Sequence, residues 1–397
     1  AANATNSATE RMFANDEINQ LQQEISRVSA NTRYNGTQIL NGSFSAKSLQ
    51  VGIMSGEDIS FSIDSIEASL LGTYVITSPV LAPNGVNSTA FASTNNGVDG
   101  DDVTIVGNGN TRMVTIEASE SAKSAAVKIN AVAGATTVFA QARTAALLRS
   151  SSSTDLSYTI KVNNVETAAF SLSSAGVTDA VTKINAITAS TGVMAAATTD
   201  GKVLLVDTNG DNITIENTST QTSLYVAAVE NDGVTVAAAG GEDQLLASGG
   251  TDLTTISGTI RLTSTAGFTV TQATAAGAGA SFFTDGDVAA TLGSVSAVDV
   301  TTTIGASNAL AILDGALDTV SAMRGSLGTL QNRLDYAVSN LMKVTEYTIG
   351  SRSRIQDADF AAETSRLAKA QVLQQAGASM LAQANASTDT VLQLLRG

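Results

Sequence analysis

Residues 310–341 read LAILDGALDTVSAMRGSLGTLQNRLDYAVSNL, and this segment constrains the architecture of the 397-residue chain more than any other. Its apolar residues recur alternately three and four positions apart, at Leu310, Leu313, Leu317, Val320, Leu327, Leu334, Val338 and Leu341. That spacing predicts an amphipathic helix whose apolar seam resembles one strand of a coiled coil. A seam of this kind needs a partner helix.

The N-terminal end contains a matching apolar pattern. Ile18, Leu21, Ile25 and Val28 follow helical spacing, and the helix is expected to run from near Thr9 to before Asn35-Gly36. We expect it to pack against the C-terminal seam within the same chain, leaving other faces for assembly. Residues 48–66 alternate apolar and polar like a pair of strands, with the turn at residues 56–58.

A second helical run is expected at residues 357–386. Leu367, Leu373 and Leu381 lie along it with many Ala and Gln residues and few charges. An apolar stripe with small residues suits close helix packing, so contacts with other chains are expected. Asp357 and Asp359 are two positions apart and face different ways on a helix, which argues against a catalytic pair.

The middle of the chain differs from both ends. Between Val75 and Gly305 there are 9 basic and 20 acidic residues, with many Thr, Ser, Gly and Asn. Alternation puts Val103, Ile105, Val114 and Ile116 on one face of their runs, and Val203, Leu205, Ile213 and Ile215 likewise. The middle therefore reads as short strands joined by tight turns.

This middle region also contains an internal repeat. Residues 127–132 (VKINAV) match residues 182–187 (TKINAI) at an offset of 55 positions. Each copy reads as strand, turn, strand and a short helix, near residues 121–133 or 178–188. We expect one or two compact β-rich lobes, each with a packed helix.

Composition excludes much familiar chemistry. The chain has no His and no Cys, which removes histidine-based nucleophilic catalysis, His or thiolate zinc sites and disulfides. A net charge of −15 disfavours nucleic acid as a partner, and no run of about 18 apolar residues predicts a membrane span. Asp99, Asp101 and Asp102, and the segment Asp207 to Asp211, offer oxygen ligands but lack EF-hand spacing, so tight turns are the favoured reading. No catalytic, cofactor-binding or metal-binding residue and no cofactor is expected.

Several motifs at the two ends resemble bacterial flagellin. They are ISRVSANTRYNGTQILNG at residues 25–42, LGTLQNRL at 327–334, SRIQDADFAAE at 353–363, QVLQQAG at 371–377, LAQAN at 381–385 and LLR at 394–396. The resemblance covers about residues 1–66 and 306–397, and the repeated Ile-Asn-Ala segments resemble modules in the variable middle of some flagellins.

The resemblance implies an α+β multidomain protein. Its terminal helices would form an antiparallel coiled-coil-like bundle with a β-hairpin, and β-rich outer domains would be inserted between them. The expected domains are 1–70, the N-terminal part of the helical core with the hairpin; 71–305, the variable outer part; 306–350, the C-terminal part of the helical core; and 351–397, a filament-core helix.

The resemblance also implies a function and partners. The expected function is that of a structural subunit of the flagellar filament, secreted and extracellular, without enzymatic activity. Its partners would be other subunits in a homo-polymer, a secretion chaperone and a filament cap. In the family a long helical segment precedes the part that residues 1–31 resemble, so we expect a chain lacking the N-terminal part of the conserved core, present as monomers or small oligomers.

Two alternatives stay open at this stage. One is a hook-associated protein, although the Gln-Gln-Ala-Gly and Leu-Ala-Gln-Ala-Asn matches favour flagellin itself. The other is a cell-surface homologue that binds an extracellular polysaccharide or a host surface through the middle region. Five basic residues would serve an anionic glycan there: Arg143, Arg149, Lys161, Lys183 and Lys202.

Overall fold

The computed structural model describes residues 1, 6–52, 56–86, 96–198, 200–229, 242–245, 252–272, 281–284 and 286–397. The chain divides into two compact units. One comprises Ala1–Ser45 with Ile63–Arg324, and the other comprises Ala46–Ser62 with Gly325–Gly397. Helices and strands are mixed, which confirms the α+β class expected from sequence.

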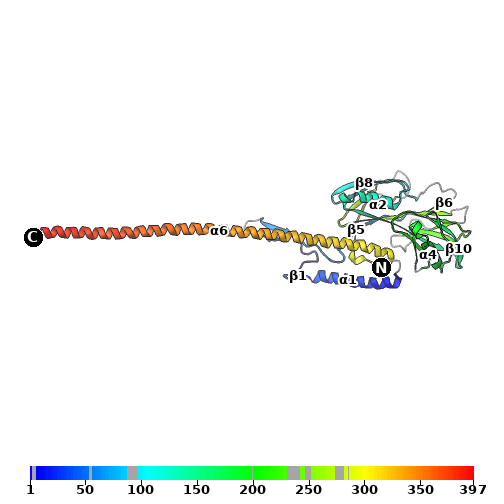
Figure 1. Cartoon of the computed structure of the whole chain (residues 1–397), viewed down its shortest axis with the longest axis horizontal. Helices are drawn as coiled ribbons and strands as arrows, with labels where there is room; N and C mark the ends of the chain where they lie inside the picture. The colour runs from blue at the N-terminus through cyan, green and yellow to red at the C-terminus, as the bar shows by residue number, and fades with distance from the viewer. Residues whose placement is uncertain are drawn as a thin grey trace. The chain divides into compact units, whose positions relative to one another are not determined.

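Helices occupy both ends of the chain (Figure 1). Helix α1 spans Ala8–Asn31 and begins at a capping box, in which Ser7 and Glu10 bond reciprocally to each other's backbone N–H. Helix α6 spans Thr303–Leu394, 92 residues, so the two C-terminal helical runs expected from sequence are parts of one continuous helix. The spacing had no signal for the intervening residues 342–356.

Two short hairpins follow α1. Strands β1 (Arg33–Tyr34) and β2 (Thr37–Gln38) pair antiparallel around Asn35-Gly36, whose backbone is left-handed. Strands β3 (Lys47–Gln50) and β4 (Asp58–Phe61) pair antiparallel, which confirms the predicted strand pair, although β3 begins one residue earlier than expected and Asp58 belongs to β4 rather than to the turn.

Antiparallel sheets make up the middle of the chain. The largest has the order β14-β15-β9-β20-β5-β23, with β17 also on β9 and β18 on β17. Its strands are β14 (Met194–Ala197), β15 (Val203–Asp207), β9 (Phe139–Ser150), β20 (Thr259–Ser264), β5 (Gly72–Thr77), β23 (Thr291–Ser294), β17 (Leu224–Ala228) and β18 (Glu242–Leu245).

Two further multistranded sheets and one pair accompany it. One sheet has the order β12 (Val165–Glu166), β11 (Ile160–Val162), β16 (Ile213–Asn217), β19 (Leu253–Ile256) and β6 (Asn84–Val86). The other has the order β22 (Gly286–Ala289), β21 (Thr269–Gln272), β7 (Asp101–Gly107) and β8 (Asn110–Ile116), while β10 (Leu156–Tyr158) pairs with β13 (Phe170–Leu172).

The 55-residue repeat is confirmed by matching helices and matching contacts. The first copy holds α2 (Ala122–Ala131) and α3 (Ala133–Thr136), and the second holds α4 (Thr178–Asn185) and α5 (Thr188–Thr191). In the first copy Asn130 bonds both the N–H and the C=O of Ala140; in the second, Asn185 does the same to Ala195. Each amide thereby joins the end of a helix to the following strand.

The repeats enclose two separate cores. One surrounds α2 and includes Val103, Ile105 and Ile129; the other surrounds α4 and includes Ile160, Ile184 and Leu205. All eight residues that alternation placed on inner faces are buried, which confirms those assignments. A third core lies where α1 meets the start of α6. Within the described residues, the helices are too short or too polar to cross a membrane.

Candidate assembly surface

The inner face of α1 packs on the first turns of α6. Ile18 and Ile25 lie half-buried against a cluster that contains Ile312 and Ala316 of α6, and Val320 lies on the same cluster. On α6 the contact is made by Ala309, Ile312, Ala316 and Val320, so of the predicted seam only Val320 reaches this core, whereas Leu313 and Leu317 lie outside it.

Polar side chains of α1 fix its position beside the segment that precedes α6. Gln22 donates through Nε2 to the Val295 carbonyl at 2.7 Å, and the Val300 N–H donates to Asn15 Oδ1 at 3.0 Å. Arg11 Nε donates to the Thr301 carbonyl at 3.2 Å. Three hydrogen bonds along one helix face specify its register, which apolar contacts alone specify less sharply.

The remaining faces of α1 and early α6 present apolar side chains to solvent. Leu21 is 57% exposed and Leu317 is 65% exposed, and Val28 and Leu313 are exposed to a smaller degree. The residues selected by spacing therefore fall into two groups: Ile18, Ile25 and Val320 face the shared core, whereas Leu21, Val28, Leu313 and Leu317 point outward.

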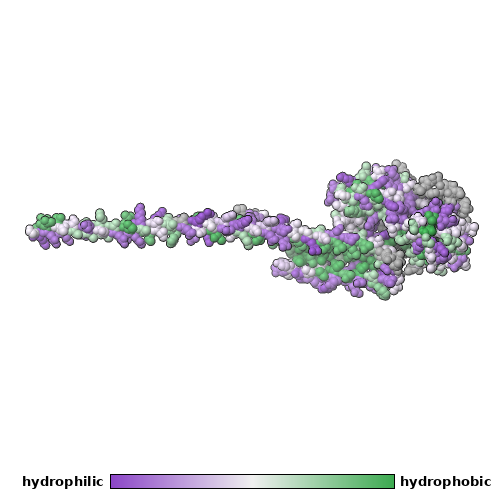
Figure 2. Space-filling model, viewed as in Figure 1, coloured by the Kyte–Doolittle hydropathy of each residue, from purple (hydrophilic) through white to green (hydrophobic). Residues whose placement is uncertain are grey.

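The part of α6 after Gly325 exposes apolar residues along its length. Leu334 and Leu341 are half-buried, and Leu327, Leu367, Leu373 and Leu381 are exposed. Figure 2 shows small apolar patches among polar ones along this part of the helix. Exposed apolar patches that recur along one helix make it a candidate interaction surface.

Sequence reasoning missed other members of this surface. Exposed residues of the same kind that the spacing did not select are Met12 and Phe13 on α1, and Tyr336, Met342, Tyr347 and Val372 on α6. The spacing of three and four positions selects apolar residues along one stripe of a helix and does not select apolar residues on its other faces. A helix with apolar residues all round is the missed signal, because such a helix is normally buried.

Charges on these helices are locally balanced. The Arg27 guanidinium hydrogen-bonds Glu24 and holds the pKa of that carboxyl below its usual value. Ser7 likewise lowers the pKa of Glu10 through backbone and side-chain hydrogen bonds. Arg366 lies 3.7 Å from Glu363 in a fully hydrated pair. Exposed pairs of this kind add little stability.

The acidic side chains of the two candidate metal segments contact other protein groups: Asp207 caps a turn, Asp211 forms an ion pair, and Asp102 lies in strand β7 rather than in the expected turn. Asp207 Oδ1 accepts hydrogen bonds from the N–H groups of Asn209 and Gly210 at 2.8 and 3.1 Å. Lys123 Nζ donates to Asp211 Oδ2 at 2.6 Å. Asp102 Oδ1 accepts the Thr115 hydroxyl at 2.6 Å. In the part of the chain that the structure describes, three or more acidic side chains nowhere gather as metal ligands would.

Comparisons with known proteins match the C-terminal helical region and the chain as a whole. A sequence profile described as the bacterial flagellin C-terminal helical region matches residues 310–395. All of the chain aligns with the B-type flagellin of Pseudomonas aeruginosa, at 35% identity over 411 positions and 80% of that protein. It is 49% identical over 98 residues to polar flagellin A of Vibrio parahaemolyticus and 52% identical over 101 residues to flagellin B of Vibrio cholerae.

The Vibrio alignments are local. Each takes in 25% of this chain and 26% or 27% of the relative. Among solved structures, FliC from Burkholderia pseudomallei aligns with 84% of this chain and 88% of its own, at 19% identity and a TM-score of 0.29.

Proposed function

This chain belongs to the flagellin family, and from that premise we propose that it builds the bacterial flagellar filament by burying the outward apolar faces of α1 and α6 against other copies of itself. It is a structural subunit of a protein polymer, and flagellin is a family of structural proteins. The observation that carries the assembly mechanism is the exposure of leucines along α6, such as Leu367, Leu373 and Leu381.

The energetics favour burial of this surface. Fully burying one leucine side chain contributes about 1.5–3 kcal/mol, and every 1.4 kcal/mol changes an equilibrium constant about tenfold. Three leucines buried per subunit would therefore strengthen addition to a filament by several orders of magnitude. Chain entropy and polar desolvation offset part of that gain.

The division of labour follows the domains expected from sequence. Residues 1–70 with 306–350 form the helical core, 351–397 form the innermost filament helix, and 71–305 form the outer part. The net charge of −11 between Val75 and Gly305 supports an outer, hydrated location for that region. We also propose that the chain is exported through a secretion channel and that its partners include a secretion chaperone and a filament cap.

Fewer observations support the alternative function, adhesion to a polysaccharide or a host surface. The relatives named above carry flagellin names, and the five basic residues expected to receive an anionic glycan do not act together. Lys161 pairs with Glu216 and Lys202 with Asp200, while the Arg149 guanidinium lies 4.3 Å from the centre of the Tyr225 ring. Most of that positive charge is already neutralised or stacked.

The test is filament formation in a bacterium whose own flagellin gene is deleted. Cells that express this sequence within its full gene should carry filaments by electron microscopy and should swim. The variant Leu367→Gln, Leu373→Gln, Leu381→Gln should abolish filaments while the secreted subunit keeps its circular dichroism spectrum.

A matched control separates assembly from general loss of apolar surface. Met113, Val127 and Met194 are exposed apolar residues of the middle region, and replacing all three with Gln makes the same chemical change there. Filaments should persist in this control. Normal filaments from the α6 variant, or equal loss from both variants, would refute assembly through α6.

A further inference from the structure

One face of the β9–β20 pair carries two arginines. Arg143 of β9 is opposite Thr259 of β20, and Arg261 of β20 is opposite Gln141 of β9. Directly opposed residues share a sheet face, and so do residues two apart on one strand. The two arginines are therefore diagonal neighbours, each facing an uncharged residue.

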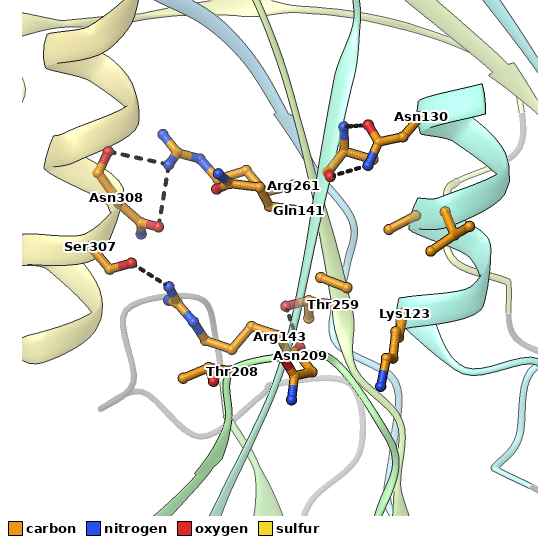
Figure 3. Close-up of a pocket in the computed structure, with 14 residues that line it drawn as sticks. Lys123, Asn130, Gln141, Arg143, Thr208, Asn209, Thr259, Arg261, Ser307 and Asn308 are labelled. Atoms are coloured by element: carbon orange, nitrogen blue, oxygen red, sulfur yellow. Dashed lines mark hydrogen bonds between the residues drawn. The ribbon is translucent and has the colours of Figure 1, made fainter. Parts of the chain in front are cut away.

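A cavity of about 470 Å³ lies over this face, between β9, β20, α2 and the first turns of α6 (Figure 3). Arg143 and Arg261 extend across it toward α6. Arg143 Nη2 donates to Ser307 Oγ at 2.9 Å, and Arg261 Nη1 donates to the carbonyl and Oδ1 of Asn308 at 3.2 and 3.3 Å.

Neither arginine meets a negative charge among the described residues. Among the described residues every acceptor of the two guanidinium groups is neutral, and the described lining residues include neither Asp nor Glu. Arg143 Nη1 is buried and, within the described part of the chain, has no acceptor. Lys123 also lines the cavity, but its ammonium is paired with Asp211 at 2.6 Å.

This arrangement carries an electrostatic cost. Arg261 is only 8% exposed, and burial together with the charge of Arg143 lowers its pKa to about 10. Burial likewise lowers the pKa of Arg143. Two like charges held close together out of water destabilise a fold unless a counter-charge offsets them. The nearby N-terminal turns of α6 add further positive potential.

We propose that this cavity binds a small molecule through an oxyanion, a phosphate or carboxylate group, held by Arg143 and Arg261. A guanidinium offers a fork of N–H donors that matches an oxyanion in two parallel hydrogen bonds, and Arg143 Nη1 supplies a donor for it. The volume lies within the range of about 300–1,000 Å³ typical of small-molecule sites, so it admits an organic anion as well as inorganic phosphate. The bound anion would join the sheet to α6.

Calorimetric titration of the full chain tests this proposal. The probes are inorganic phosphate, glucose 6-phosphate, glucuronate and, as the neutral control, glucose, all at matched ionic strength in chloride. Phosphate or one of the organic anions should bind saturably at one site, and glucose should not. The organic anions distinguish a free ion from a phosphate or carboxylate on a sugar.

Arg143→Gln should weaken that binding at least tenfold. Arg149→Gln is the matched control, since it removes the same charge from the same strand where the guanidinium lies over Tyr225. Arg261→Gln is the second variant, and circular dichroism verifies the fold of each, so a folding failure of one leaves the other to decide.

Three results would overturn the site: absence of saturable binding by every anion, equal binding to the Arg143 and Arg149 variants, or equal binding of glucose. Filament formation plays no part in the measurement, so its outcome is independent of the proposed assembly.

Discussion

At the residue scale, the carboxylate of Asp207 stabilises a turn through hydrogen bonds, and its burial carries an electrostatic cost. It is buried at the end of β15, and its Oδ1 caps two backbone N–H groups. Burial raises the pKa of Asp207 above its ordinary value of 3.8, against the opposing effect of those hydrogen bonds. A pKa raised by folding means that the folded state binds the proton more tightly than the unfolded chain.

The Asp207→Asn variant should therefore change the pH dependence of stability. The contribution of Asp207 is fully present below pH 3.8 and is lost as the pH rises through its higher folded pKa. Asparagine keeps the Oδ1 acceptor without the charge, so urea unfolding between pH 4 and 7 should show a smaller decline for the variant. Asp207→Ala removes the acceptor and should cost about 1–3 kcal/mol at pH 7. Identical pH slopes for wild type and Asp207→Asn would contradict the assignment.

Gly210, three residues further on, is a second test at this scale. Its φ is +81°, and a Cβ there would lie 2.3 Å from Ala142 Cβ and 2.9 Å from the Ala142 carbonyl carbon. Gly210→Ala should lower the free energy of unfolding by more than about 2 kcal/mol, because backbone strain and a steric clash combine. Gly36→Ala is the control, since Gly36 also has a φ of +81° but open space around it. In Gly36→Ala only the backbone strain, about 1–2 kcal/mol, should lower the free energy of unfolding. If chemical denaturation gives equal losses for the two variants, the steric clash at Gly210 is refuted.

At the scale of elements, the two repeats should respond alike to loss of their asparagines. Asn130 and Asn185 each make two hydrogen bonds to the backbone of the following strand, at 2.8 and 2.9 Å. Asn130→Ala and Asn185→Ala should each lower the free energy of unfolding by about 1–2 kcal/mol, since each leaves one N–H and one C=O of the strand without a partner. Chemical denaturation measures this change. A loss in only one copy would show that the shared motif does not carry a shared structural role.

Local patterns predicted these elements well, and long-range pairing lay beyond them. The 55-residue offset located both helices and both asparagines, and alternation found the buried faces, because each signal is contained within a few turns or strands. The pairing of β5 with β20 and β23 joins segments about 200 residues apart, and their short apolar runs do not encode a unique partner. Arg143 and Arg261 come together only through such a pairing, so their site had no sequence signal.

At the scale of the whole molecule, the two ends and the middle hold their apolar residues differently. The middle buries its own, in cores where residues such as Leu205, Ile215 and Ile260 are wholly inaccessible. The part of α6 after Gly325 exposes residues such as Leu373, which is 62% exposed. The middle therefore has the packing of a domain stable by itself, while late α6 leaves large apolar side chains exposed.

Hydrogen exchange should reveal this contrast directly. Isolated helices in water are marginal because most helical stability in proteins comes from packing of an apolar face. In the monomeric chain, amides of residues 325–394 should exchange rapidly, whereas amides of β16 and β20, which line buried cores, should exchange slowly. Mass spectrometry after brief exposure to deuterated water measures both in one sample.

Incorporation into a filament should then protect α6 and leave the middle region unchanged. Packing against neighbouring subunits removes the exposed leucines from water, so local opening of the helix becomes costly and exchange of residues 325–394 should slow by at least an order of magnitude. Strands β16 and β20 are the internal control, since their protection arises within one subunit. Strong protection of late α6 in the dilute monomer would mean that the helix is stable without partners, and the link between its exposed leucines and assembly would then fail.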